Sequence, residues 1–98
     1  MELEGWQLGP DDWPLTCEAA ARDIIEWLSP VARQELRATP QPDLIRLHFG
    51  LGMTIRDRHG LHRGNAALLE SCLGPFGHPD SASMKIIERA WELVQGQK

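Results

Sequence analysis

Residues 44–65 read LIRLHFGLGMTIRDRHGLHRGN, and this stretch decides the fold that we expect for the chain. Its apolar residues recur three and four positions apart, which is the spacing of one face of an α-helix. We therefore predict an amphipathic helix from about residue 42 or 43 to residue 58, ended by Gly60. Gly50 and Gly52 inside it indicate a bend or a close crossing by another backbone. The predicted inward face consists of Leu44, Leu47, His48, Leu51 and Ile55.

Two helices are expected on the N-terminal side of this stretch. Thr16 is a typical N-cap, and apolar residues continue at helical spacing to about residue 28. Ser29 and Pro30 favour a new start, because serine caps helices and proline loses no hydrogen bond at a first helical position. The second helix is therefore predicted over residues 30–38. The residues expected to be buried are Ala20, Ile24, Ile25, Trp27, Leu28, Val31 and Leu36.

Two further helices are expected on the C-terminal side. Asn65 is an N-cap candidate for a short helix that ends at about Cys72. Asp80 or Ser81 is expected to cap a last helix over about residues 81–95. The inward face of that helix is predicted to contain Met84, Ile87, Trp91 and Val94.

The composition fits one small globular domain. The chain has 98 residues, of which 42% are hydrophobic and 24% are charged. We predict an all-α protein, an irregular bundle of about five short helices over residues 16–98. Residues 1–15 contain glycine and proline and form an irregular leader. Trp6 and Trp13 in this leader must pack back onto the body or bind a partner.

The charges are unevenly distributed along the chain. The net charge is −4, but residues 27–63 carry six arginines against three acidic residues. Overall acidity argues against nucleic-acid binding. No signal peptide precedes the body and no apolar run approaches the ~20 residues that span a bilayer, so we expect a cytoplasmic protein without membrane contact. Cys17 and Cys72 are then expected to be reduced and buried, with a disulfide or a reactive thiol as the alternative.

A basic cluster follows the apolar half of the opening stretch. Arginine forks suit phosphates and carboxylates, which predicts an anion-binding site. The alternative is structural pairing with the acidic first third of the chain. The cluster consists of Arg56, Arg58, His59, His62 and Arg63. The candidate acidic partners are Asp11, Asp12, Glu18, Asp23 and Glu26.

His59 and His62 form the only close histidine pair in the sequence. A metal site would need at least one more ligand, for which Asp57 and the more distant Cys72 are candidates. The simpler expectation is that both histidines face solvent, because Gly60 ends the helix between them. We expect no cofactor and no enzymatic activity, since no ordered set of nucleophile and base occurs.

Two separated motifs resemble a known protein family. LHFGLGMTIR at residues 47–56, followed by Gly60-Leu61, and HPDSASMKII at residues 78–87 resemble a family of small bacterial proteins known as a domain of unknown function. There the helix typically reads LHxxLGxxIRNxxGLW, and HPDDxS opens the final helix. The resemblance covers roughly residues 20–94. The chain departs from the family pattern at Asp57, His62 and Ser81.

The resemblance implies a cytosolic bacterial protein with a helical fold, and it groups His48, Arg56, Asp80 and Ser83. An arginine that ends one helix can pair with an aspartate that caps another. This set is therefore either a structural lock between the two motifs or a ligand site. His48 is expected to be a core residue whose ring binds a carbonyl or a carboxylate.

The leading functional hypothesis is that the chain is a non-enzymatic domain that binds another protein, as immunity proteins, antitoxins and inhibitors do. A second copy of the chain is a further candidate partner. Exposed aromatic and arginine side chains are frequent anchors of interfaces. The predicted contacts are Trp6, Trp13, Arg58, His59, His62 and Arg63. The alternatives are an anion- or phosphate-binding site at Arg56–Arg63 and a metal site at His59 and His62.

Overall fold

The computed structural model describes residues 7–75 and 77–96, and over these residues the protein is all-α without strands. The predicted fold class is confirmed. The α-helices are α1 (Cys17–Trp27), α2 (Pro30–Ala38), α3 (Met53–Arg58), α4 (Ala66–Leu73) and α5 (Pro79–Gly96). Two 3-10 helices, η1 (Pro10–Asp12) and η2 (Gln41–Leu47), and a π-helix, η3 (His48–Gly52), complete the described elements. Trp6 lies outside the described residues.

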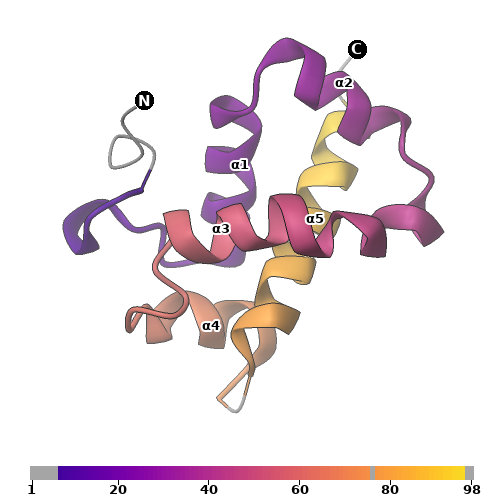
Figure 1. Cartoon of the computed structure of the whole chain (residues 1–98). Coiled ribbons are helices and arrows are strands. Elements are labelled where there is room, and N and C mark those ends of the chain that lie inside the picture. Colours follow the sequence, from indigo (N-terminus) through magenta and orange to yellow (C-terminus); the bar gives the residue numbers. More distant parts are fainter. Residues whose placement is uncertain (1–6, 76, 97–98) are drawn as a thin grey trace.

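Helix α5 forms the centre of the bundle. In Figure 1 the rod made of η2, η3 and α3 crosses α5, while α4 lies near its start, α1 alongside its middle and α2 toward its end. The side chains of α5 that face these neighbours are fully buried, and α1, η2, α3 and α4 each add apolar residues to the same core. The fully buried residues of α5 are Ala82, Ser83, Ile86, Ile87 and Ala90.

Three predicted N-caps hold the starts of α1, α2 and α4. The side-chain oxygens of Thr16, Ser29 and Asn65 accept hydrogen bonds from backbone N–H groups three residues later, at 3.1, 3.1 and 3.2 Å. Each bond satisfies a donor that has no partner within the helix itself. The sequence-based starts of these three helices are therefore confirmed.

The last helix starts earlier than predicted. It begins at Pro79, and Nδ1 of His78 accepts a hydrogen bond from the backbone N–H of Asp80 at 3.2 Å. The prediction that Asp80 or Ser81 caps this helix is therefore wrong. Because His78 caps the helix, the carboxylate of Asp80 remains available for a contact elsewhere.

Residues 41–58 form one continuous helical rod that changes type along its length. The prediction of a single α-helix is wrong in type, since the rod is 3-10 in η2, π in η3 and α only in α3. Its inward face is nevertheless the predicted one, except that His48 lies outside the core. Leu44 and Ile55 are buried, and Leu47 and Leu51 pack against the same core.

The two glycines of the rod play different parts. A Cβ atom on Gly52 would lie 3.1 Å from Nη1 of Arg56 and 3.6 Å from Oγ of Ser83 on α5. Gly52 therefore allows α5 to cross closely, as the sequence indicated. A Cβ atom on Gly50 would meet nothing within 4 Å, so close packing does not explain that glycine.

Two apolar residues predicted to be buried are exposed. Val31 is 69% exposed and Trp27 is 40% exposed. Trp27 covers the guanidinium of Arg58, whose central carbon lies 5.5 Å from the ring centroid. Arginine is attracted to the face of an indole ring, so Trp27 shields a charged side chain instead of filling the apolar core.

Helix α3 ends in a turn that requires glycine. Gly60 has a φ of 71°, and the backbone N–H of Leu61 donates to the carbonyl of Arg56 at 3.0 Å, as in a Schellman motif. The indole of Trp13 lies directly against Gly60, where a Cβ atom would overlap the ring. Both the backbone conformation and the contact with the leader therefore exclude other residues.

Replacing Gly60 with alanine is expected to lower the free energy of unfolding by about 2–4 kcal/mol. Positive φ costs an alanine about 1–2 kcal/mol, and displacing Trp13 adds a comparable amount. Urea denaturation measures the loss. Gly64→Ala is the matched control, because Gly64 has a φ of 102° but no atom near its missing Cβ. Equal losses in the two variants would contradict a role for the Trp13 contact.

Candidate functional site

Asp23 on α1 binds the two basic residues at the end of α3. Nε and Nη2 of Arg58 donate to its Oδ2 and Oδ1 at 2.7 and 3.1 Å, and Nε2 of His59 lies 2.7 Å from Oδ2. Because an ionised carboxylate only accepts hydrogen bonds, we assign the ring proton of His59 to Nε2. Arg58 and His59 are 8% and 0% exposed. We call these three residues the Asp23 cluster.

The Asp23 cluster keeps its carboxylate ionised. Burial alone would raise the pKa of Asp23, but the hydrogen bonds from His59 and Arg58 outweigh it and hold that pKa well below its usual range. The prediction that His59 faces solvent is wrong, and the expected surface position of Arg58 is wrong as well. The structural alternative, in which the basic cluster pairs with the acidic first third of the chain, is confirmed for Arg58.

The described part of the leader packs on the turn that follows α3. The backbone N–H of Leu8 donates to the carbonyl of Arg58 at 3.1 Å, and Nε1 of Trp13 donates to the carbonyl of Leu8 at 3.0 Å. The guanidinium carbon of Arg63 lies 5.5 Å from the centroid of the Trp13 ring. Trp13 is therefore largely occupied by contacts within the chain.

These contacts leave His62 and Arg63 as the exposed members of the predicted basic cluster. His59 points inward to Asp23, so the histidine pair does not converge on one point. Among residues 7–75 and 77–96, no three His, Cys, Asp or Glu side chains are placed to hold a metal ion together.

Arg56 joins α3 to the first turn of α5. Its Nε lies 3.4 Å from Oδ1 of Asp80, and its Nη1 donates to Oγ of Ser83 at 3.0 Å. The hydroxyl of Ser83 donates in turn to the carbonyl of Asp80 at 2.8 Å. Arg56 is 6% exposed, whereas the Asp80 side chain is 47% exposed. We call these three residues the Asp80 cluster, and their contacts bring together residues that the family resemblance grouped.

His48 lies at the edge of the Asp80 cluster. Its Nε2 is 4.0 Å from Oδ2 of Asp80, and its ring meets that of Phe49 edge-on at a centroid distance of 5.0 Å. Its Nδ1 is buried and has no hydrogen-bond partner in the described part of the chain. The expected carboxylate neighbour is present, but His48 is only half-buried and is not a core residue.

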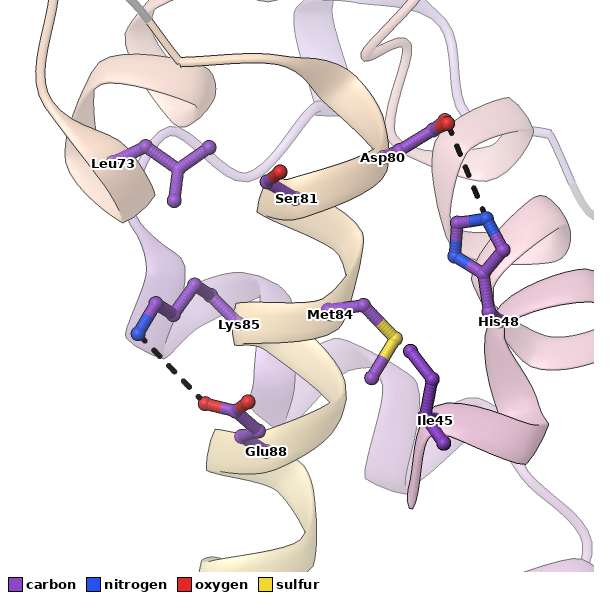
Figure 2. A pocket seen from close by; sticks show the side chains of 8 residues that line it. All are labelled: Ile45, His48, Leu73, Asp80, Ser81, Met84, Lys85 and Glu88. Carbon is purple, nitrogen blue, oxygen red and sulfur yellow. Dashed lines mark ion pairs between the residues drawn. The ribbon is translucent and has the colours of Figure 1, made fainter. Parts of the chain in front are cut away.

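A groove opens beside His48, between η2 and α5 (Figure 2). Its volume is about 360 Å³. Figure 2 shows Ile45 and Met84 close together on one side, with the carboxylate of Asp80 beside the ring of His48. Lys85 and Glu88 approach each other at 3.9 Å on the far rim. The lining side chains are Ile45, His48, Leu73, Asp80, Ser81, Met84, Lys85 and Glu88.

An exposed row of apolar side chains continues from this groove along the helical rod. Ile45, Phe49 and Met53 are spaced four residues apart and are 62%, 78% and 50% exposed. The rod turns by more per residue in η2 and by less in η3 than an α-helix does, so what the three residues share is their exposure along the rod. We call these three residues the apolar stripe. These residues were not among the predicted contacts, although three apolar residues four positions apart and outside the predicted core face are visible in the sequence.

Fold and site together define a small helical domain with two internal charged clusters and one exposed apolar stripe. The chain belongs to the family described as a domain of unknown function (DUF6794), which matches residues 13–93. The family resemblance found in the sequence is thereby confirmed. No curated protein and no solved structure matches the chain. None of the described helices has the length and apolar character needed to cross a bilayer.

Proposed function

We propose that the chain is a non-enzymatic protein-interaction domain of the immunity, antitoxin or inhibitor kind, and that its partner docks on the apolar stripe. The observation that carries this proposal is the exposure of Ile45, Phe49 and Met53 along one helical rod. Large apolar side chains that gather on a surface are typical of protein interfaces, whereas single exposed ones are ordinary.

The groove next to the stripe supports the proposal. Ile45 belongs to both, so an apolar segment laid along the stripe can place an anchoring side chain in the groove. The carboxylates of Asp80 and Glu88 on the rim are about half-exposed. Each of them already has a cationic partner, Arg56 for Asp80 and Lys85 for Glu88. The favoured partner is therefore defined by its apolar anchor.

The proposed contact surface differs from the one that the sequence suggested. Arg58 and His59 are held inside by Asp23, and Trp13 is largely covered, so these residues contribute little to a docking surface. The π-helix η3 supports the new location, because π-helical turns occur frequently at functional sites. The motifs at residues 47–56 and 78–87 favour a bacterial cytoplasmic setting for the interaction.

The test compares capture by the wild-type chain and by Phe49→Glu. Each tagged protein, at micromolar concentration, is used as bait in a lysate of the organism that encodes it. We expect the wild type to retain a specific partner and Phe49→Glu to retain at least about tenfold less, because a charge at an interface hot spot costs about 2 kcal/mol or more.

Val31→Glu is the matched control. Val31 is also an exposed apolar residue, but it lies on α2, away from the stripe. Both variants should unfold at the wild-type temperature, and Val31→Glu should capture as the wild type does. Absence of any specific partner, or equal capture by Phe49→Glu, would overturn the proposal. A rise of melting temperature with inorganic phosphate that Arg63→Ala abolishes would favour the anion-binding alternative instead.

A further inference from the structure

Two cysteine sulfurs meet where α1 begins and α4 ends. Cys17 is the first residue of α1 and Cys72 lies in the last turn of α4, and their Sγ atoms are 2.7 Å apart as free thiols. A disulfide bond is about 2.05 Å long, so a covalent link needs a movement of well under one ångström.

Ser71 holds the two sulfurs in this position. Its hydroxyl oxygen accepts a hydrogen bond from the backbone N–H of Cys17 at 2.8 Å. The bond ties the first turn of α1 to the residue that precedes Cys72. The N–H groups at a helix start have no partner within the helix, and this contact supplies one while it joins α1 to α4. The fold therefore keeps the two thiols next to each other.

The surroundings distinguish the two thiols. The hydrogen bond from Cys72 is the main cause that lowers the pKa of Cys17, with further help from Lys85 and Arg89 and against the opposing effects of burial and Glu18. The same bond, together with burial, raises the pKa of Cys72. Only a thiolate attacks a disulfide, so Cys17 is the residue that reacts first.

Both thiols also open onto a surface pocket. The pocket has a volume of about 390 Å³, and Lys85 and Arg89 of α5 line it together with Cys17 and Cys72. Arg89 binds Glu18 at 2.6 Å on the same wall. Glu18, Glu88 and Glu92 line the same pocket and pair with Arg89 and Lys85, so its charges are largely balanced. A small reagent can therefore reach the sulfurs without crossing a wall of one charge.

We propose that Cys17 and Cys72 are a redox site that forms an intramolecular disulfide by exchange with low-molecular-weight disulfides such as oxidised glutathione. The Cys17 thiolate attacks one sulfur of the reagent, whose S–S bond breaks and releases one small thiolate. Cys72 then loses its proton and attacks Sγ of Cys17, which expels the second small thiol. The reagent gains two electrons and two protons, and the protein loses them.

The disulfide would join residues 55 positions apart in the chain and enclose the sequence from α1 to α4. A cross-link of this span restricts the unfolded chain much more than the folded one. The oxidised protein is therefore expected to melt about 10–20 °C above the reduced protein. Because cytosolic disulfides are usually transient, the cysteine pair would act as a reversible redox sensor and not as a permanent structural disulfide.

The experiment exposes the full chain to oxidised glutathione and follows it by intact-mass spectrometry. The wild type should lose two hydrogens and carry no glutathione, with the higher melting temperature reversed by dithiothreitol. Cys72→Ser should stop at a mixed disulfide on Cys17. Cys17→Ser should likewise form no intramolecular disulfide and stop at a mixed disulfide on Cys72.

Reduced wild type and both serine variants are first compared by thermal unfolding, so that misfolding is recognised separately. Ala67→Ser on the exposed side of α4 serves as a control that should oxidise as the wild type does. Two free thiols that persist in excess oxidised glutathione would overturn the proposal, and so would a disulfide-linked dimer as the main product. Both results are independent of whether the apolar stripe binds a partner.

Discussion

Asp23→Ala is expected to lower the free energy of unfolding by about 3–5 kcal/mol, because removing one member of a buried ion pair leaves the other charge uncompensated. The guanidinium of Arg58 stays charged at any ordinary pH and is only 10% exposed at its side chain. The ring of His59, which is fully buried, loses its partner at the same time. A small domain has only about 5–15 kcal/mol of stability, so the loss is a large share of the total.

Urea denaturation followed by tryptophan fluorescence measures this loss, and Trp27 beside Arg58 reports on the site itself. Glu26→Ala, an exposed substitution on the same helix, should change the stability by no more than about 0.5 kcal/mol. A comparable change in the two variants would show that the Asp23 cluster does not stabilise the fold.

The pH dependence of stability gives the Asp23 prediction a second signature. The pKa of Asp23 in the folded protein lies below its unfolded value of about 3.9. Its stabilising effect is therefore complete above that value and is lost as the pH falls through the lower folded pKa. The wild type should lose stability progressively below about pH 4. Asp23→Asn should start less stable and show a smaller decline over the same range.

Arg56→Ala is expected to lower the free energy of unfolding by about 2–4 kcal/mol, through lost hydrogen bonds and a cavity at a buried site. The guanidinium reaches Asp80 and Ser83 with two different nitrogens. Arg56→Lys should recover little of the loss, because a single ammonium does not reproduce this fork. Thermal or urea unfolding measures both variants.

A double-mutant cycle separates the Asp80 cluster from simple loss of packing. Arg56→Ala, Asp80→Ala and the double variant should show a coupling energy of at least about 0.5 kcal/mol, as residues in one polar network do. Arg46 is an exposed arginine on the same helical rod, so Arg46→Ala is the control and should leave the free energy of unfolding nearly unchanged. Additive effects of Arg56→Ala and Asp80→Ala would mean that the contact does not stabilise the junction of α3 and α5.

The starts of α1, α2 and α4 could be predicted because their determinants are local. A cap such as Ser29 needs only the N–H groups of the next few residues, and Gly60 ends α3 through its own backbone. The pairing of Arg56 with Asp80 could be anticipated only because the sequence resembles a family pattern that groups these residues. It joins positions 24 residues apart, and no local rule specifies such a pair.

The Asp23 cluster illustrates what sequence patterns leave open. Arg58 and His59 lie in a polar segment, and composition alone places such residues at the surface. Their burial depends on α1 bringing a carboxylate from 35 and 36 positions away. Several acidic residues were available, and only the packing of α1 selected Asp23. The apolar stripe was not predicted for a different reason. Helical spacing identifies the face of the rod that is buried, and Phe49 lies outside that face, so the pattern predicts no role for it.

The basic stretch that first suggested a ligand site thus has mainly internal contacts. Arg56 joins the rod to α5, while Arg58 and His59 join it to α1. The side of the rod that carries Phe49 has no such role in the described residues, although it exposes apolar surface to water. Exposed apolar area is unfavourable unless something covers it, which is why we propose the stripe as the docking surface.

Hydrogen exchange measured by mass spectrometry, on the free chain and on the chain with its captured partner, tests this central claim most directly. The account predicts that partner binding slows amide exchange in residues 44–53 and leaves residues 58–63 unchanged. New protection confined to residues 58–63, with residues 44–53 exchanging as in the free chain, would contradict it.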